Sequence, residues 1–327
     1  MVTEAPPTLQ VIAAAAARMA PYIRETPVWD WQDDLVSATL KLELFQHSGT
    51  FKARGAINNV LSLTDDQRRR GVTAVSAGNH AAAVAYAAHT LGTTAKVVMP
   101  KTASPARIAI CRRLGAEIVL AADVHEAFVL VKEVESAEGR TFVHPFEGPT
   151  TATGTATVGL EFLRQADDLE AIVIPIGGGG LIGGMAAAIK QIRPDCLVYG
   201  VEPSGNDVIK RSVASGVPET SPNPNSIADS LSPPFALPYS LSLVQRFVDD
   251  IVLVSDDDLT EAMYLLFERM KLAVEPAGAA TTAAALGPLR ERLRGKRTGL
   301  LICGANIDAT RFAEYLQRGA ARWSTRE

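Results

Sequence analysis

The chain has 327 residues, of which 47% are hydrophobic and 21% are charged, and its formal net charge at pH 7 is −4. This composition is typical of a globular protein and excludes a disordered or fibrous chain. Because no broad basic surface is expected, we predict a small-molecule ligand, no nucleic-acid partner and no membrane association. The length predicts one large α/β unit or two domains.

Short β-branched segments alternate with alanine-rich segments of helical pattern. The predicted strands are residues 40–44, 74–76, 96–99, 117–120, 172–176, 197–201 and 299–302. This order predicts an α/β fold of open, mainly parallel sheets flanked by helices, with ligands at the carboxyl ends of the strands. Residues 217–238 are rich in proline and predict a long ordered loop, after which the strand pattern resumes at Phe247. Ser255 and the three aspartates after it are interpreted as a helix cap and an acidic first turn, rather than a metal site.

The first candidate functional segment is Thr50-Phe51-Lys52, because a helical pattern begins at Lys52. A lysine at a helix N-terminus, buried beside Phe51, tends to lose its proton and become the neutral amine that forms a Schiff base. An ordinary solvated lysine is the alternative for this residue taken alone.

The second segment, residues 76–80, follows a predicted strand and opens an alanine-rich helix. Ser76, Asn79 and the first N–H groups of the helix are able to hold a substrate carboxylate, and His80 adds a donor. Helix caps and a buried core histidine are the alternative.

The third segment is the run Gly177, Gly178, Gly179 and Gly180 between a predicted strand and a helix at residues 181–191. Backbone N–H groups of such a loop favour a phosphate, and close packing of the backbone is the alternative. The uncharged residues 171–189 also raise the possibility of a membrane span, which Pro175 and the six glycines of this stretch argue against.

A competing pattern overlaps the glycine run. Gly178, Gly180 and Gly183 have GxGxxG spacing, and Glu202 follows about 20 residues later, as in dinucleotide-binding domains. An NAD-dependent oxidoreductase is therefore an alternative from another class. It leaves Lys52 and residues 76–80 without a role, so we rank it lower.

Four segments together resemble, in the same order, the serine/threonine dehydratase and serine racemase family of fold-type II pyridoxal phosphate (PLP) enzymes. Residues 50–52 resemble the cofactor-lysine segment, residues 76–80 the asparagine loop, and residues 177–180 the tetraglycine phosphate loop. Cys303-Gly304-Ala305-Asn306 resembles the closing segment whose first residue faces the pyridine nitrogen. The similarity runs from about residue 23 to residue 316.

The resemblance implies a two-lobed, tryptophan synthase β-like fold. Residues 1–70 plus 146–327 would form a large PLP-binding domain, and residues 71–145 a small substrate-side domain that closes over the substrate. It also implies a homodimer. The cysteines Cys111, Cys196 and Cys303 show no CxxC spacing, and no signal-peptide order is seen at the N-terminus, so we expect a cytoplasmic protein.

The resemblance also implies the site residues. Lys52 would be the catalytic residue, tethering PLP and then removing the α-proton. The implied cofactor-binding residues are Phe51, Lys52, Asn79, Gly177, Gly178, Gly179, Gly180, Leu181 and Cys303. The implied substrate-binding residues are Thr50, Ser76, Asn79 and His80. A thiol at Cys303 gives the pyridine little reason to stay protonated, which favours prompt β-elimination.

The implied activity is that of a lyase of amino-acid catabolism. This ammonia-lyase (dehydratase) would convert a 3-hydroxy amino acid of the L-threonine, L-serine or hydroxyaspartate type to a 2-oxo acid and ammonia. An amino-acid racemase of the same family is an alternative, but Ala77 stands where racemases carry a serine acid/base, so we rank the lyase first. A PLP-binding protein without catalysis is a further alternative.

Three departures from the family pattern affect detail. Ser230 stands where relatives often have glycine and adds a hydroxyl near the cofactor, and Thr155 stands where glutamine is common. Both suggest a substrate other than plain threonine. The cation site of some relatives matches Glu202 and, near Val208, lacks its second acidic residue, so this site is incomplete. We assign no metal-binding residue, and binding of a divalent cation near Glu202 is left open.

Overall fold

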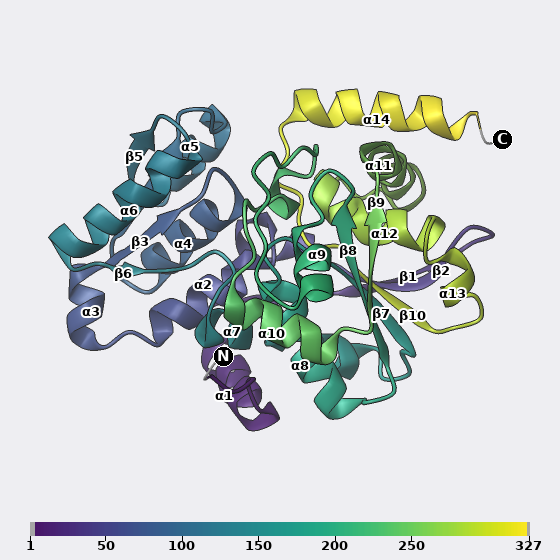
Figure 1. The fold of residues 1–327 in the computed structure, drawn as a ribbon, viewed down its shortest axis with the longest axis horizontal. Helices are drawn as coiled ribbons and strands as arrows, with labels where there is room; N and C mark the ends of the chain where they lie inside the picture. Colours follow the sequence, from purple (N-terminus) through teal and green to yellow (C-terminus); the bar gives the residue numbers. More distant parts are fainter. Residues whose placement is uncertain (1–3, 326–327) are drawn as a thin grey trace.

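The computed structural model describes residues 4–325, apart from the side chains of residues 105, 106, 124 and 125. The strands of the first sheet are β1 (Val28–Gln32), β2 (Ser37–Lys41), β7 (Ala171–Pro175), β8 (Leu197–Pro203), β9 (Asp250–Val254) and β10 (Thr298–Leu301). Their order is β1-β2-β10-β7-β8-β9, and every pair except β1 with β2 is parallel. The predicted α/β fold with mainly parallel sheets is confirmed (Figure 1).

A second sheet lies to the side of the first (Figure 1). Its strands are β3 (Val72–Val75), β4 (Ala95–Pro100), β5 (Glu117–Ala121) and β6 (Thr141–Phe142), in the parallel order β5-β4-β3-β6. We call this sheet and its helices α4 (Asn79–Thr90), α5 (Pro105–Arg113) and α6 (Val124–Glu138) the small lobe. Alternate residues of β4 face opposite ways, since Val97 packs in the cluster that holds α4, while Val98 packs with Val131 of α6.

The remaining helices surround the six-stranded sheet or connect the two sheets. They are α1 (Leu9–Met19), α2 (Lys52–Leu61), α3 (Asp65–Arg70), α7 (Pro149–Gln165), α8 (Gly180–Ile192), α9 (Val208–Ser215), α10 (Pro238–Phe247), α11 (Asp256–Met270), α12 (Pro276–Leu286), α13 (Arg290–Leu293) and α14 (Ala309–Trp323). Short 3₁₀ helices occupy η1 (Glu43–Phe45), η2 (His47–Gly49) and η3 (Asp229–Leu231). Within residues 4–325, none of the helices combines the length and hydropathy that a membrane span requires.

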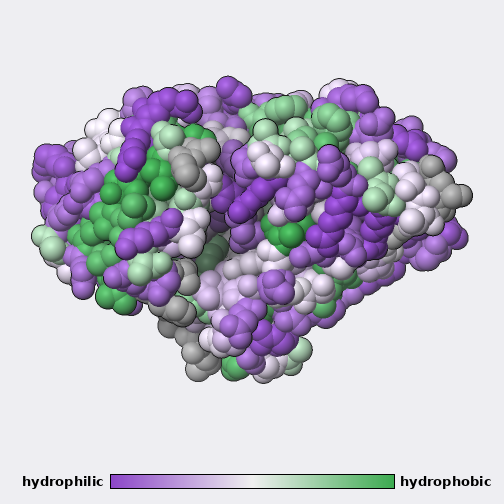
Figure 2. Space-filling view, turned by 90° about the horizontal axis from the view of Figure 1, so that it is seen from above, coloured by the Kyte–Doolittle hydropathy of each residue, from purple (hydrophilic) through white to green (hydrophobic). Residues whose placement is uncertain are grey.

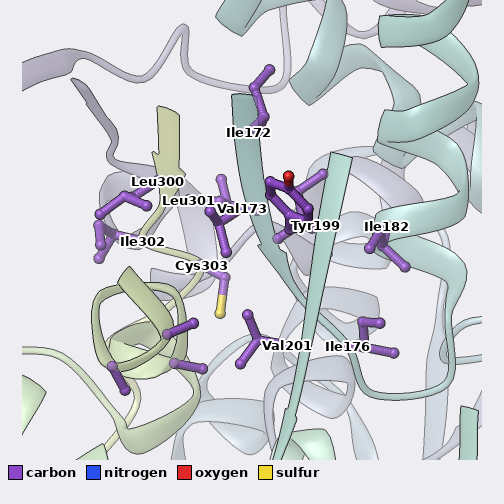
Figure 3. Close-up of a cluster of buried hydrophobic side chains, with 14 of the residues drawn as sticks. Ile172, Val173, Ile176, Ile182, Tyr199, Val201, Leu300, Leu301, Ile302 and Cys303 are labelled. Atoms are coloured by element: carbon purple, nitrogen blue, oxygen red, sulfur yellow. The ribbon is translucent and has the colours of Figure 1, made fainter. Parts of the chain in front are cut away.

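The main core forms on the six-stranded sheet, where β7 is buried along its whole length. Apolar side chains of β7, β8 and the β10 segment meet there, and Cys303 lies just beyond the end of β10 (Figure 3). Both α8 and α12 pack against β7. This burial on all sides explains why residues 171–189 carry no charge: they form a buried strand, a loop and a helix.

Two helices approach each other closely beneath the glycine loop. A Cβ atom at Gly184 of α8 would lie 2.4 Å from the Ala152 carbonyl oxygen of α7, so only glycine allows this contact. Thr155 of α7 donates from Oγ1 to the carbonyl oxygen of Gly180 at 2.7 Å. Thr155 therefore braces the start of α8.

Two predicted elements need correction. The strand predicted at residues 40–44 ends at Lys41 and continues as η1, because Glu43 turns inward to pair with Arg54. The strand expected to resume at Phe247 begins at Asp250, since Phe247 is the last residue of α10. The ordered loop before α10 is confirmed, and so is the cap at Ser255, whose side chain accepts from the N–H of Asp258.

Candidate active site

One cavity of about 240 Å³ lies between the small lobe and the carboxyl ends of β7 and β10. The surface is hollowed between the small lobe and the rest of the molecule when it is seen from above (Figure 2). The predicted site residues that line the cavity are Phe51, Lys52, Ser76, Asn79, His80, Gly177, Gly178, Gly179, Gly180, Leu181 and Cys303. The structure thus brings together four segments that are far apart in the sequence.

Lys52 is the first residue of α2, as predicted, and its amine faces this cavity. Its Nζ donates to the carbonyl oxygen of Pro145 at 2.5 Å and lies 5.2 Å from the centroid of the Phe51 ring. Burial lowers the pKa of Lys52 to about 8, against weaker opposing effects of Cys303 and Glu275. The neutral fraction of this amine near pH 7 is therefore larger than that of an ordinary lysine, and the neutral amine is the state that attacks a carbonyl carbon.

The glycine loop connects the end of β7 to the start of α8. Gly179 has φ 87°, a left-handed conformation that favours glycine, and no side chain caps the helix there. A Cβ atom at Gly178 would lie 2.2 Å from the Phe146 ring, and one at Gly180 would lie 2.0 Å from the Phe146 carbonyl oxygen. The glycines therefore serve close packing as well, and they leave an uncapped helix N-terminus at the cavity wall.

Cys303 follows the end of β10 and is buried against the cavity. Burial raises the pKa of the thiol well above its usual range, and the nearby Glu275 carboxylate acts in the same direction. The thiol is therefore neutral. A neutral thiol beside an aromatic nitrogen supplies no formal charge to it.

Asn79 is held by its amide between two partners. Its Nδ2 donates to Oε1 of Glu275 at 2.6 Å, and its Oδ1 accepts from Nδ2 of Asn306 at 2.7 Å. These bonds fix the amide plane and leave one Nδ2 hydrogen for a ligand.

Ser76 and His80 flank the N-terminus of α4. Oγ of Ser76 accepts from the N–H of Gly78 at 3.0 Å, while Nε2 of His80 donates to the carbonyl oxygen of Val143 at 2.8 Å. Burial lowers the pKa of His80 to about 3, so the imidazole is neutral. One of its two nitrogens is thus committed to the backbone, although the ring lines the cavity.

Thr50 is not brought to the cavity wall. Its side chain is fully buried beside Gly304, and its Oγ1 has no hydrogen-bond partner among the described residues. Its role in substrate binding stays a prediction.

Several lining residues were assigned no role from the sequence, although Glu275-Pro276-Ala277-Gly278 also resembles the family. Glu275 precedes α12, is fully enclosed, and has one oxygen without a partner among the described residues. Burial raises the pKa of Glu275 to about 7, with a further contribution from Asp229.

Arg107 of α5 pairs with Asp229 at 2.9 Å and also donates to the carbonyl oxygen of Asn306 at 3.0 Å, so it links the small lobe to the other wall of the cavity. The remaining lining residues that sequence reasoning missed include Phe128, Phe146, Pro233 and Pro234.

A buried ionic network holds the helix that carries Lys52. Arg54, two residues later, contacts Glu43 at 2.7 Å and Glu161 at 2.9 Å, and Lys41 contacts Glu161 at 2.5 Å. Arg54 and Glu43 are completely buried, so this network connects α2 with η1 and α7 in a region of low dielectric.

The cavity fits PLP on three independent observations. The uncapped glycine loop suits a phosphate, the Lys52 amine suits an aldehyde, and the buried neutral thiol suits a pyridine nitrogen. Ser230 also lines this cavity, and its Oγ has no partner among the described residues, so it adds the hydroxyl expected from the sequence. Fold and site together define an α/β enzyme that uses PLP.

Comparison with known proteins agrees with this class. Residues 19–304 match the family model described as pyridoxal-phosphate dependent enzyme, and the chain belongs to that family. It is 55% identical over 317 residues to phenylserine dehydratase of Ralstonia pickettii, covering 96% of this chain and 97% of the relative. It is 40% identical over 279 residues to the catabolic L-threonine dehydratase of Escherichia coli K12, covering 84% of each. The structure of maize serine racemase superimposes with a TM-score of 0.90 at 34% identity, over 98% of this chain and 100% of the other.

The family match confirms the prediction that PLP is the cofactor and does not support the NAD-dependent alternative. Glu202, which that alternative needs at a ribose, instead accepts from the backbone N–H groups of Ile209 and Lys210 at 2.9 and 2.8 Å. Its carboxyl thus caps α9, and burial raises its pKa to about 8.

Proposed function

We propose that this protein is a PLP-dependent ammonia-lyase in which Lys52 carries the cofactor and acts as the base on a 3-hydroxy amino acid. The observation that supports it most directly is the Lys52 amine, with its pKa lowered to about 8, in one cavity with the uncapped glycine loop. The dehydratases among the relatives support the same reaction, elimination of the 3-hydroxyl group.

The cofactor, when bound, supplies an electron sink that makes the α-proton of an attached amino acid removable. Residues 177–180 and Leu181 would hold its phosphate, Asn79 its ring hydroxyl, and Cys303 its ring nitrogen. Phe51 and Phe146 add apolar surface to the cavity walls, which excludes water from the reacting atoms.

Among the chain's own groups, one would take the α-proton and the others would bind the substrate. Lys52 Nζ is the only lysine amine among the residues that line this cavity, and it accepts the proton from the substrate Cα. His80 is neutral, with its pKa lowered to about 3, so it acts as a hydrogen-bond partner and not as a cationic acid. Ser76 and the first N–H groups of α4 line the same cavity and would bind the substrate carboxylate.

The cavity also favours elimination over racemisation. Racemisation needs a second acid/base group on the opposite side of Cα, and Ala77, which lines the cavity, offers only a methyl group. We therefore rank the racemase second.

We also expect the small domain on the substrate side, residues 71–145, to move against the remainder of the chain during turnover.

The test is release of 2-oxo acid by purified protein loaded with PLP. L-serine, L-threonine, the 3-hydroxyaspartate isomers and 3-phenylserine are offered in turn, with Lys52→Ala as control. Turnover by the native protein that the control loses supports the proposal. Absence of release from all of them, in protein that visibly holds PLP, contradicts it.

A further inference from the structure

One part of the cavity wall is apolar and takes no part in the proton transfers described above. Phe128 of α6, Phe146, and the Pro233-Pro234 pair of the loop before α10 line it. These residues come from the small lobe, from the segment after β6 and from the proline-rich loop. Three separate parts of the chain thus supply one apolar surface.

The aromatic rings of this wall are packed against one another. The ring centroids of Phe128 and Phe235 are 5.5 Å apart with planes at 57°, and those of Phe146 and Phe235 are 6.4 Å apart at 55°. Both separations lie in the range of favourable tilted aromatic pairs. Phe235 does not itself line the cavity, so it supports Phe128 and Phe146 from behind.

Phe146 is fixed further by its other neighbours. Its ring meets the imidazole of His144 edge-on, with centroids 4.7 Å apart and planes at 88°, and it packs directly on Gly178. Phe146 is also the rigid end of the wall because its backbone accepts from Ser240 at 2.9 Å. Phe128, on the small lobe, is the partly exposed end.

The two charged side chains that line the cavity near this wall are paired with each other. Arg107 is paired with Asp229, and the hydroxyl of Ser232 donates to the carbonyl oxygen of Ala228 at 3.0 Å. No free cation is therefore presented beside Phe128 by the described residues that line the cavity, apart from Lys52 at its base. An anionic substrate side chain has no partner on this wall, whereas an aromatic one has apolar contacts.

We propose that Phe128, supported by Phe235, forms with Phe146, Pro233 and Pro234 an aryl subsite that selects 3-hydroxy amino acids bearing an aromatic ring on C3. This inference rests on the proposed function and deepens it by assigning the substrate class to residues. The name of the 55% identical relative, phenylserine dehydratase, agrees with the same class. Loss of one such contact surface changes discrimination between small substrates by roughly 10-fold to 200-fold.

Phe128 borders the surface of the molecule as well as the cavity, and this affects which substitutions are informative. Phe128 and Phe235 also border an open surface hollow beside Val129, which is 57% exposed. The Phe128 ring therefore separates the cavity from solvent, and removing it admits water as well as removing a contact. Phe128→Leu keeps apolar bulk at this point, so it separates the two effects from each other.

The experiment compares kcat/KM for 3-phenylserine and L-threonine in holoenzyme carrying Phe128→Ala, Phe128→Leu or Phe235→Ala. We expect Phe128→Ala to lower the value for 3-phenylserine by about 10-fold to 100-fold and that for L-threonine by less than about 3-fold, with smaller shifts for the other two. Phe312→Ala is the matched control, because Phe312 contacts Phe267 edge-on at 5.6 Å on α14 and α11, away from the cavity. It should change neither value.

A binding measurement gives a readout independent of turnover. L-phenylalanine and L-alanine lack the leaving hydroxyl, so the ratio of their dissociation constants for the holoenzyme reports the aryl contact alone. We expect L-phenylalanine to bind native protein at least about 10-fold more tightly, and Phe128→Ala to remove most of this preference.

Two results would overturn the aryl subsite. One is equal loss of both substrates in Phe128→Ala, and the other is a native protein that binds L-phenylalanine no more tightly than L-alanine. Release of 2-oxo acid from L-threonine in that second case leaves the lyase proposal standing. If no hydroxy amino acid is turned over while L-phenylalanine still binds preferentially, the lyase proposal fails and the aryl subsite stands.

Discussion

The wall of the cavity proposed to hold the cofactor and the apolar wall proposed to hold the substrate side chain are formed by different kinds of groups. The wall proposed to hold the cofactor consists of backbone and buried groups, namely the glycine loop, Cys303 and Lys52 at the start of a helix anchored by an ionic network. The apolar wall consists of side chains from separate segments, of which Phe146 packs on the glycine loop and Phe128 is only partly buried. A fixed cofactor site that adjoins a wall of side chains allows the substrate to change without rebuilding the catalytic centre.

Removal of the Lys52 amine from the cofactor wall should have the largest effect on activity. Lys52→Ala should lower 2-oxo acid release by at least about 10³-fold, because it removes both the tether and a general base that contributes roughly 10²-fold to 10⁴-fold. The rate of 2-oxo acid formation at saturating PLP measures it. Residual turnover above a tenth of the native rate would show that another group is the base.

The ionic network should matter for folding although it lies outside the cavity. Arg54→Met leaves the buried Glu43 without a cation and Glu161 with Lys41 alone, which should lower the free energy of unfolding by about 3–5 kcal/mol. Urea unfolding of native and variant protein measures the difference. Arg69→Met is the control, since Arg69 pairs with Asp66 at the surface, where such pairs contribute about 0–1 kcal/mol. Equal stability of both variants contradicts an anchoring role.

The lowered pKa of Lys52 predicts a pH dependence. Only the neutral amine attaches PLP, so in protein stripped of cofactor the attachment rate should rise about tenfold per pH unit below the pKa. It should level off above about pH 8, where the amine is mostly neutral. Stopped-flow absorbance follows the reaction, with a small lysine peptide measured in parallel to remove the ionisation of PLP itself. A rate that keeps rising toward pH 10 would indicate an ordinary lysine.

The smallest expected effect concerns Ala77 on the substrate side. Ala77→Ser places a hydroxyl on the cavity wall and should allow measurable conversion of L-serine to D-serine, with elimination reduced by less than about 10-fold. Chiral chromatography of the reaction mixture detects it. The ranking of lyase above racemase is wrong if the native protein already racemises serine substantially.

The difference between the walls also governs what could be predicted from the sequence. The cofactor wall is made of short contiguous segments, each with a pattern that can be read locally. Their resemblance to one family, in the same order, predicted that Lys52, residues 76–80 and the glycine loop share one site. Phe128 has the pattern of an ordinary apolar residue of a helix, and Pro233 that of a loop. Their approach depends on how the small lobe packs against the loop, which no local pattern encodes.

Two buried carboxylates, those of Glu275 and Glu43, also depend on tertiary contacts that local sequence patterns do not predict. Glu275 carried a usable signal, since an acidic residue directly before a proline begins a helix, yet its burial beside Asn79 is a tertiary contact. The apolar residues around Glu43 predicted that the strand continues to residue 44. It ends at Lys41 instead, because the Glu43 carboxylate turns inward and accepts hydrogen bonds from Arg54. Long-range ion pairs of this kind override local propensity.

The most direct test of the central claim is to locate the cofactor on the chain. Protein loaded with PLP is reduced with borohydride, digested and analysed by peptide mass spectrometry. We expect a phosphopyridoxyl group on Lys52 and on no other lysine, and its absence from Lys52→Arg protein treated in the same way. Stable modification of a different lysine, with Lys52 unmodified, would show that Lys52 does not carry the cofactor.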